Sequence, residues 1–317
     1  MKNILNQKLH SISFIFVAFS LLLISCQNTE INSSKFDLEK LNQIDNLINK
    51  SIDSNSLPGA VVLVAKNNKI VYKKAFGIKN PTSGEKYKTD DIFRIASMTK
   101  AITSLGIIKL WEKGLFGLDD PIEKYIPEFK GAGVLDKFNP LDSTYTIKPT
   151  QKKISIRNLL THTSGLGYGF IDGNPSIKAI FHKTKKNFMP NGVLGFSDSD
   201  VSIEKVIKEI AKVPLHHEPG ERYTYAIGID VLGYLIEIIS GESLADFFQN
   251  EIFNPLEMND TFFYLPEDKK DRLVPVLYKN ENEWLIFKDT RFNINYPIEG
   301  AKSCLLYTSD AADDTLC

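Results

Sequence analysis

Apolar residues recur at every third or fourth position in several parts of the chain, and this spacing predicts amphipathic helices. The first such segment is 37–53. Another segment, 228–240, is followed by Gly241, and a glycine in this place is typical of a helix C-terminus. A serine at the start of a segment, as at Ser155, is typical of an N-cap. The further helices that we expect are 154–161, 202–211, 228–240 and 243–253.

Other segments follow the pattern of β-strands. The runs "AVVLVAK" and "KIVYKKAFG" are joined by Asn67-Asn68, which predicts a hairpin. Two short strands are expected later, in "RLVPVLYK" and "EWLIFK", whereas residues 166–200 are rich in Gly, Asn, Ser and Lys and predict a long irregular segment. A two-stranded hairpin is at best marginally stable alone, so we expect strands beyond residue 303 to complete the sheet.

The segment "FRIASMTKAITSLGIIKLW", residues 93–111, predicts one more helix, which should end near Gly114. We expect it to be a central, buried helix, because it is apolar on almost every side. Its apolar stripe consists of Ala101, Ile102, Leu105, Ile108 and Trp111.

Composition and charge fit an ordinary globular protein. The 317 residues are 43% hydrophobic and 24% charged, with a net charge of −1. The chain has no long basic run, so we expect no nucleic-acid partner.

The N-terminus has the pattern of a secretory signal. Lys2 and Lys8 precede an apolar run that is too short to span a membrane and is followed by Cys26. "LISC" resembles a bacterial lipobox, which predicts a signal peptide over 1–25, lipidation of Cys26 and a polar tether over 26–36. The resemblance implies a lipoprotein of the bacterial cell envelope, with the lipid as its only contact with the membrane.

The C-terminal segment departs from the rest of the chain. Residues 304–313, "CLLYTSDAAD", resemble the in-frame translation of a transposon adapter that is used in sequencing libraries. We therefore expect the folded domain to be 37–303, with 304–317 as an artefact and the natural coding sequence continuing beyond Ser303. The domain would then contain no disulfide, because Cys26 is the only cysteine outside this segment.

Ser97 and Lys100 are the first candidates for chemistry. Residues i and i+3 lie on one face of a helix, so Lys100 should lie beside Ser97 and could take its proton. The N-terminus of the helix adds a positive field for an attacked carbonyl. The alternative is a capping serine with a solvent-exposed lysine, because Ser-x-x-Lys is common by chance.

Three blocks of sequence resemble the serine β-lactamase and penicillin-binding-protein superfamily, in its class C-like branch near the family VIII carboxylesterases. They are "FRIASMTKAITSLGIIKLWEKGLFGLDDPIEKYIPEF", "IRNLLTHTSGLGYG" and "PLHHEPGERYTYAIGIDVLGYLIEIISGESLADFFQNEIFNPLEMNDTFF". The resemblance implies an α+β fold, a sheet with a helical subdomain, over about residues 36–303. It also implies that Ser97 is the nucleophile and that a third motif lies on a strand that this chain lacks.

The family's second motif, Tyr-x-Asn, falls on Tyr225-Ala226-Ile227. The resemblance implies that Tyr225 carries protons at the site, with Tyr223 as the alternative phenol. Ile227 occupies the position of the substrate-binding Asn and cannot hydrogen-bond to a substrate amide. This departure favours ester substrates over β-lactams and peptides.

Three histidines are set aside. His162 would fit a helix end and turn better than a catalytic base. His216, His217 and Glu218 are consecutive, so they would not converge on one ion, and a loop is the expected structure. We therefore expect no metal and no organic cofactor.

The expected function is that of an envelope-anchored serine hydrolase. It would act on a small-molecule ester or amide, such as a β-lactam or a peptidoglycan-type peptide, through an acyl-enzyme on Ser97. The alternatives are a non-catalytic penicillin-binding or sensor protein of the same fold and a D-alanyl-D-alanine carboxypeptidase.

Overall fold

The computed structural model describes residues 38–67, 69–169, 172–188, 202–287 and 307–308. Two local features explain where helices start and stop. Ser155 and Asn158 form a capping box before α4, and Gly241, at φ 74°, ends α7 in the left-handed conformation. The helices are α2 (Leu38–Asp53), α3 (Thr99–Glu112), α4 (Ile156–Leu160), α5 (Pro175–Phe188), α6 (Ile203–Ile210), α7 (Gly228–Ser240) and α8 (Leu244–Phe248).

The strands form small antiparallel sheets. Their orders are β1-β2-β3, β4-β10-β7, β5-β6 and β8-β9. Their bounds are β1 (Gly59–Lys66), β2 (Lys69–Asn80), β3 (Glu85–Lys86), β4 (Phe93–Arg94), β5 (Gly133–Asn139), β6 (Thr144–Pro149), β7 (Thr261–Phe262), β8 (Leu277–Asn280), β9 (Glu283–Ile286) and β10 (Tyr307–Thr308).

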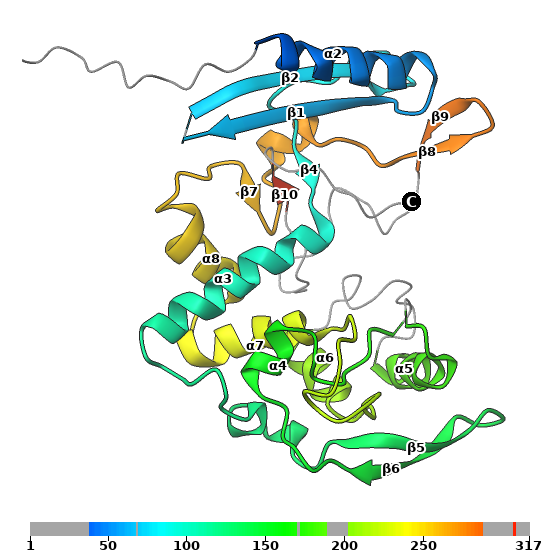
Figure 1. Cartoon of the computed structure of the whole chain (residues 1–317), viewed down its shortest axis with the longest axis vertical. Coiled ribbons are helices and arrows are strands. Elements are labelled where there is room, and N and C mark those ends of the chain that lie inside the picture. The colour runs from blue at the N-terminus through cyan, green and yellow to red at the C-terminus, as the bar shows by residue number, and fades with distance from the viewer. Residues whose placement is uncertain (1–37, 68, 170–171, 189–201, 288–306, 309–317) are drawn as a thin grey trace, which may run out of the picture.

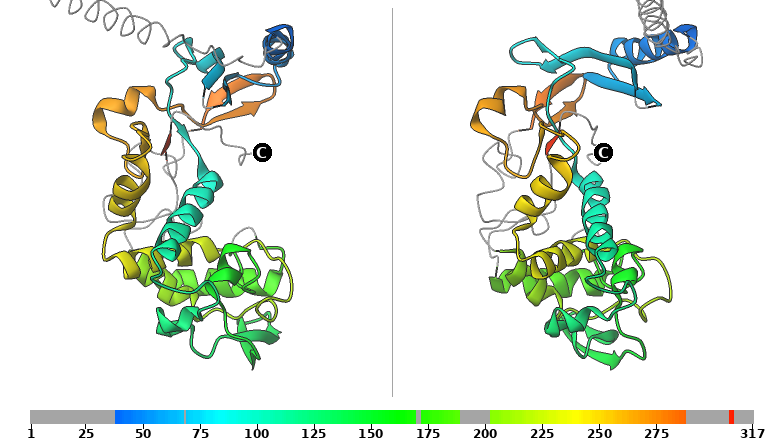
Figure 2. Two further views of the ribbon diagram at one scale, coloured as in Figure 1. Left: turned by 60° about the vertical axis from the view of Figure 1, so that its left-hand side comes forward. Right: turned by 90° about the vertical axis from the view of Figure 1, so that its left-hand side faces the viewer.

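Helix α3 links two parts of the molecule. The sheet β1-β2-β3, helix α2 and the hairpin β8-β9 lie at one end, and the helices α4 to α7 lie at the other with the hairpin β5-β6 (Figure 1). The turned views show the same arrangement, with α3 running from the strands to the helices (Figure 2). The first turn of α3 therefore lies near the junction of the two parts.

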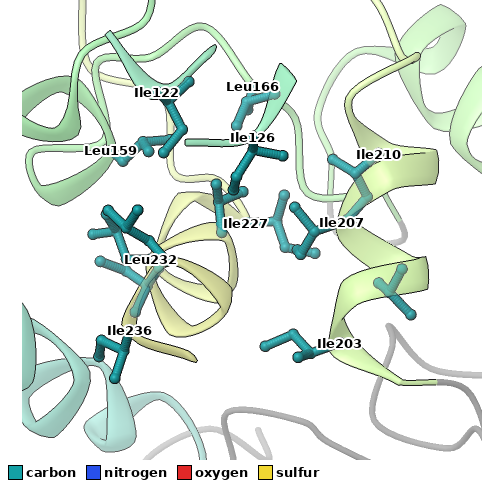
Figure 3. Close-up of a cluster of buried hydrophobic side chains, with 14 of the residues drawn as sticks. Ile122, Ile126, Leu159, Leu166, Ile203, Ile207, Ile210, Ile227, Leu232 and Ile236 are labelled. Carbon is teal, nitrogen blue, oxygen red and sulfur yellow. The ribbon is translucent and has the colours of Figure 1, made fainter. Parts of the chain in front are cut away.

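The largest hydrophobic cluster lies in the helical part. Ile203, Ile207 and Ile210 repeat along α6, which places them on one face, and this face packs toward α7 (Figure 3). Leu232 and Ile236 extend from α7 into the same cluster, and both are completely buried. The cluster fixes α7, and α7 begins just after the Tyr225 motif.

The helices that the sequence predicts are present, but residues 166–200 were interpreted wrongly as wholly irregular. Residues 175–188 form α5, whose Ile177, Ile180 and Phe181 are buried. The apolar residues that follow Pro175 and Ser176 have helical spacing, but the Gly and Asn residues around them made this pattern hard to recognise in the sequence. Residues 189–200 lie outside the described residues.

The strand predictions missed the hairpin β5-β6 and the strand β3. All six residues of β6 are exposed, and its run TYTIKP contains only two large apolar residues, Tyr145 and Ile147, which is a short pattern on which to predict a strand. Strand β3 has only two residues, and it makes the predicted hairpin β1-β2 a three-stranded sheet. Of the predicted run "RLVPVLYK", only Leu277 to Lys279 belong to a strand.

The apolar stripe buries α3 only in part, because Ile102 and Ile108 are half-buried and Ile102 packs against the largest hydrophobic cluster. The buried residues of α3 are Thr99, Thr103, Gly106, Ile107 and Leu110. A Cβ on Gly106 would approach side chains of α7 and α8 to 3.0–3.2 Å, so the absence of a side chain there lets the helices pack closely. The stripe residues Ala101, Leu105 and Trp111 are exposed instead.

Tyr307 and Thr308 form β10, which pairs with Phe93–Arg94 on one side and Thr261–Phe262 on the other. These two residues belong to the segment that the sequence analysis excluded from the fold. The remainder of 304–317 lies outside the described residues, as do the predicted signal peptide, Cys26 and the tether.

Candidate active site

Ser97 lies in a short 3₁₀ turn, Ala96–Met98, that leads directly into α3. The preceding residue, Ala96, has φ 38°, which a residue with a side chain rarely adopts. Such strain is concentrated at functional sites, where the surrounding structure holds it in place. The turn leaves the Ser97 side chain half-buried rather than enclosed in the core.

Lys100 and Tyr225 both contact the hydroxyl of Ser97. The ammonium of Lys100 donates a hydrogen bond to Ser97 Oγ over 3.2 Å. The Tyr225 hydroxyl lies 3.0 Å from the same atom. The structure thus brings together the three residues that the sequence assigned to catalysis.

Tyr225 lies in the segment that leads into α7, between two aromatic neighbours. Its ring stacks on Tyr168 with centroids 5.2 Å apart and an angle of 9° between planes. The imidazole of His162 lies 5.0 Å from the Tyr225 ring on a tilt of 34°. The phenol is 36% exposed, so both neighbours restrict it while its hydroxyl remains accessible.

Tyr168 is a site residue that the sequence analysis missed. It lies in the run "GYGF", to which the sequence assigned no catalytic role. In the structure, Lys100 Nζ lies 5.5 Å from the centre of the Tyr168 ring and 5.2 Å from that of Tyr225. The two electron-rich faces therefore help to hold the ammonium beside Ser97. Nothing in the local spacing of "GYGF" indicates this contact.

A hydrogen bond between His216 and Asp172 fixes the loop that carries Tyr168. His216 Nε2 lies 2.9 Å from Asp172 Oδ2, and the same carboxylate oxygen accepts the backbone N–H of Tyr168 over 3.1 Å. Burial opposes the charge on Asp172, but the hydrogen bonds from His216 and from the Asn174 and Tyr168 backbone lower its pKa below the ordinary value. The carboxylate is therefore ionised and holds the loop at neutral pH.

The other two histidines of the region both contact the Tyr225 segment. His217 Nε2 is 2.9 Å from Thr224 Oγ1, and its Nδ1 lies 2.9 Å from the Glu218 carbonyl. His162 accepts the backbone N–H of Ala226 on Nδ1 and that of Thr224 on its carbonyl. Ring nitrogens of His216 and His217 hydrogen-bond to other groups of the protein. Glu218 accepts the backbone N–H of Gln151.

Tyr223 and Ile227 have other surroundings in the structure. Tyr223 is 64% exposed and meets the edge of the His162 ring, whereas the hydroxyl that contacts Ser97 is that of Tyr225. Ile227 is 2% exposed and belongs to the hydrophobic cluster (Figure 3). This burial differs from the substrate contact that the sequence predicted, because an apolar side chain at the start of α7 packs inward.

Comparison with known proteins finds esterases among the similar sequences. Esterase EstB of Burkholderia gladioli is 30% identical over 232 residues, which are 72% of this chain and 53% of the esterase. The lovastatin esterase of Penicillium rubens is 32% identical over 240 residues, 73% of this chain and 55% of that enzyme. The chain thus spans about half the length of these curated relatives.

A solved structure shows the same fold. EstCE1, described as a hydrolase with promiscuous acyltransferase activity, aligns with a TM-score of 0.65 and 25% identity, covering 78% of this chain and 59% of EstCE1. Residues 44–302 match the Beta-lactamase family. That range includes Ser97, Lys100 and Tyr225, and with the fold and the site it shows that this chain belongs to the Beta-lactamase family of serine active-site proteins.

Proposed function

We propose that the protein is a serine hydrolase that cleaves small ester substrates through an acyl-enzyme on Ser97. The observation that carries this proposal is the convergence of Lys100 Nζ and Tyr225 Oη on one hydroxyl, at 3.2 and 3.0 Å. A serine hydroxyl needs such neighbours to act as a nucleophile near neutral pH.

In the proposed mechanism, Lys100 donates a hydrogen bond to Ser97 Oγ, and the Ser97 hydroxyl donates its proton to the oxygen of Tyr225, which lies 3.0 Å away. As Oγ attacks the ester carbonyl, its proton passes to the Tyr225 oxygen while Tyr225 releases its own hydroxyl proton toward the alcohol oxygen of the ester, and the ammonium of Lys100 stabilises the negative charge that develops on Ser97 Oγ and Tyr225 Oη.

The reaction then proceeds in two halves. The new bond joins Ser97 Oγ to the carbonyl carbon, the bond from that carbon to the alcohol oxygen breaks, and Tyr225 gives the proton to the departing alcohol. Water next attacks the acyl group, its proton passes through Tyr225 back to Ser97, and the carboxylic acid leaves. Lys100 remains in place throughout as the cation that both steps use.

Two observations support esters as the substrates. Ile227 is apolar and buried, so its side chain offers no hydrogen bond to the amide of a β-lactam or peptide. Two of the curated relatives are named as esterases.

Labelling with a fluorophosphonate tests the proposal, because this probe phosphonylates an activated serine. The intact protein should be labelled, and mass spectrometry should map the adduct to Ser97. The matched control is Ser104→Ala, which removes a hydroxyl from the second turn of α3. Labelling that survives Ser97→Ala, or that Ser104→Ala abolishes, would contradict the assignment.

We also propose that a lipid attached to Cys26 anchors the protein to the cell envelope. The support is the sequence "LISC" after a short apolar run. Within the described part of the chain, no helix is long and apolar enough to cross a membrane. Cells that are fed radioactive palmitate should label the wild-type protein and should leave the Cys26→Ser variant unlabelled; equal labelling would exclude this anchor.

A further inference from the structure

His162 has a backbone conformation that needs an explanation. It follows α4 with φ 53°, in the left-handed region that favours glycine and asparagine. A histidine in this conformation costs free energy, and such residues persist where the surrounding structure requires them. The conformation allows the carbonyl and the ring of His162 to contact the same neighbouring segment.

That segment is the one that carries Tyr225. The carbonyl of His162 accepts the N–H of Thr224 over 2.8 Å, and His162 Nδ1 accepts the N–H of Ala226 over 3.2 Å. One residue thus binds the main chain immediately before and immediately after Tyr225. The imidazole also packs against the Tyr225 ring, at 5.0 Å between centroids.

We propose that His162 is the positioning residue of Tyr225, which keeps the phenol hydroxyl within hydrogen-bond distance of Ser97. This inference rests on the proposed function, because it assigns the purpose of the contact to the reaction at Ser97. It gives His162 no proton to transfer and no contact with the substrate.

The contact requires a neutral imidazole. A nitrogen that accepts a hydrogen bond carries no proton, so the single proton of the ring lies on Nε2. The charged and titratable groups that face His162 are Lys100 of α3, Tyr223 and Tyr225. Burial and then the charge of Lys100 lower the pKa of His162, and both effects favour the form that binds Ala226.

Two substitutions separate the acceptor from the backbone strain. His162→Gly accommodates the positive φ but removes Nδ1 and the ring. His162→Asn also tolerates this conformation and places its carbonyl oxygen near the position of Nδ1. Both variants keep the backbone carbonyl that binds Thr224. The matched control is His182→Asn, on the exposed face of α5.

The kinetic experiment measures hydrolysis of p-nitrophenyl butyrate by the intact protein. His162→Gly should lower kcat by about 10- to 100-fold, as expected for a misplaced catalytic group, with little change in KM. His162→Asn should recover most of the loss, and His182→Asn should match the wild type. A normal kcat in His162→Gly, or an Asn variant as slow as the Gly variant, would overturn the inference.

A second measurement does not depend on activity. Hydrogen exchange at the Ala226 amide should be slow in the wild type and in His162→Asn and faster in His162→Gly. If the wild type neither hydrolyses esters nor reacts with the fluorophosphonate, the proposed function fails, and the exchange result then decides the inference. Equal protection of Ala226 in all three proteins would show that His162 does not hold this segment.

Discussion

The hydroxyl of Ser97 lies 3.0 Å from that of Tyr225, although 128 residues separate them in the chain. This contact joins the start of α3 to the start of α7, two helices that pack against each other. Their packing is close because Gly106 of α3 has no side chain, and Ile236 of α7 lies over it. The separation between nucleophile and phenol is therefore set by the helical core.

The contact predicts different outcomes for the two neighbouring tyrosines. Tyr225→Phe removes the oxygen that receives the Ser97 proton, so kcat for p-nitrophenyl esters should fall by roughly 10²–10⁴-fold. Tyr223→Phe should leave kcat near the wild-type value, because Tyr223 is largely exposed. Steady-state kinetics of the two variants distinguishes the two tyrosines. A low kcat in Tyr223→Phe with a normal kcat in Tyr225→Phe would assign the role to Tyr223.

We propose that substrate preference follows from the lack of a hydrogen-bonding side chain at Ile227. Because this position offers no hydrogen-bonding group, kcat/KM should be higher for p-nitrophenyl acetate and butyrate than for the β-lactam nitrocefin. Both reactions are followed by absorbance with the same preparation. A higher kcat/KM for nitrocefin would show that amide recognition comes from another part of the protein.

The loop that contains Gly165 and Tyr168 should be sensitive to substitution of Gly165. This residue has φ 82°, and a Cβ there would lie 2.4 Å from the carbonyl oxygen of His217. Gly131 has nearly the same φ, 80°, and open space around it. Gly131→Ala should lower the free energy of unfolding by about 1 kcal/mol through strain alone.

Gly165→Ala should lower the free energy of unfolding by roughly 1–3 kcal/mol more, because backbone must move to make room. Denaturant unfolding of both variants measures the difference. Equal losses would mean that the His217 segment moves freely away from the new methyl group.

His162 predicts a pH dependence of stability. Its pKa in the folded protein lies below the ordinary 6.5, because burial and then Lys100 disfavour the charged ring. Between these two pKa values the unfolded chain binds more protons, so stability falls as the pH drops from about 6.5 toward the folded pKa. Above 6.5 this contribution is constant.

His162→Asn should remove that part of the slope when unfolding free energies are compared across this range. His182→Asn, at an exposed position, should keep the wild-type slope. An unchanged slope in His162→Asn would place the responsible group elsewhere.

Local spacing was enough to predict part of this site. Ser97 and Lys100 are three residues apart at a helix start, and helix geometry alone places them together. The start of α4 at Ser155 and the end of α7 at Gly241 were likewise predicted from single residues with known capping preferences.

The contacts of Tyr168 and His162 could not be predicted in this way. His162 and Ala226 are 64 residues apart, and their hydrogen bond exists only because α4 packs on α7. The same holds for the buried face of α3. Thr103 and Gly106 face the core there because small residues allow close approach, whereas hydrophobicity alone would have chosen Leu105 and Trp111.

The exposed stripe of α3 gives the protein an optical property. The sequence contains two tryptophans, Trp111 on this stripe and Trp284 in β9. Trp111 is 42% exposed, so its indole is in contact with water, and its emission lies at longer wavelength than that of a dry indole. In a Trp284→Phe variant, all tryptophan fluorescence would come from α3, and its emission wavelength would report how much water reaches the helix that follows the nucleophile.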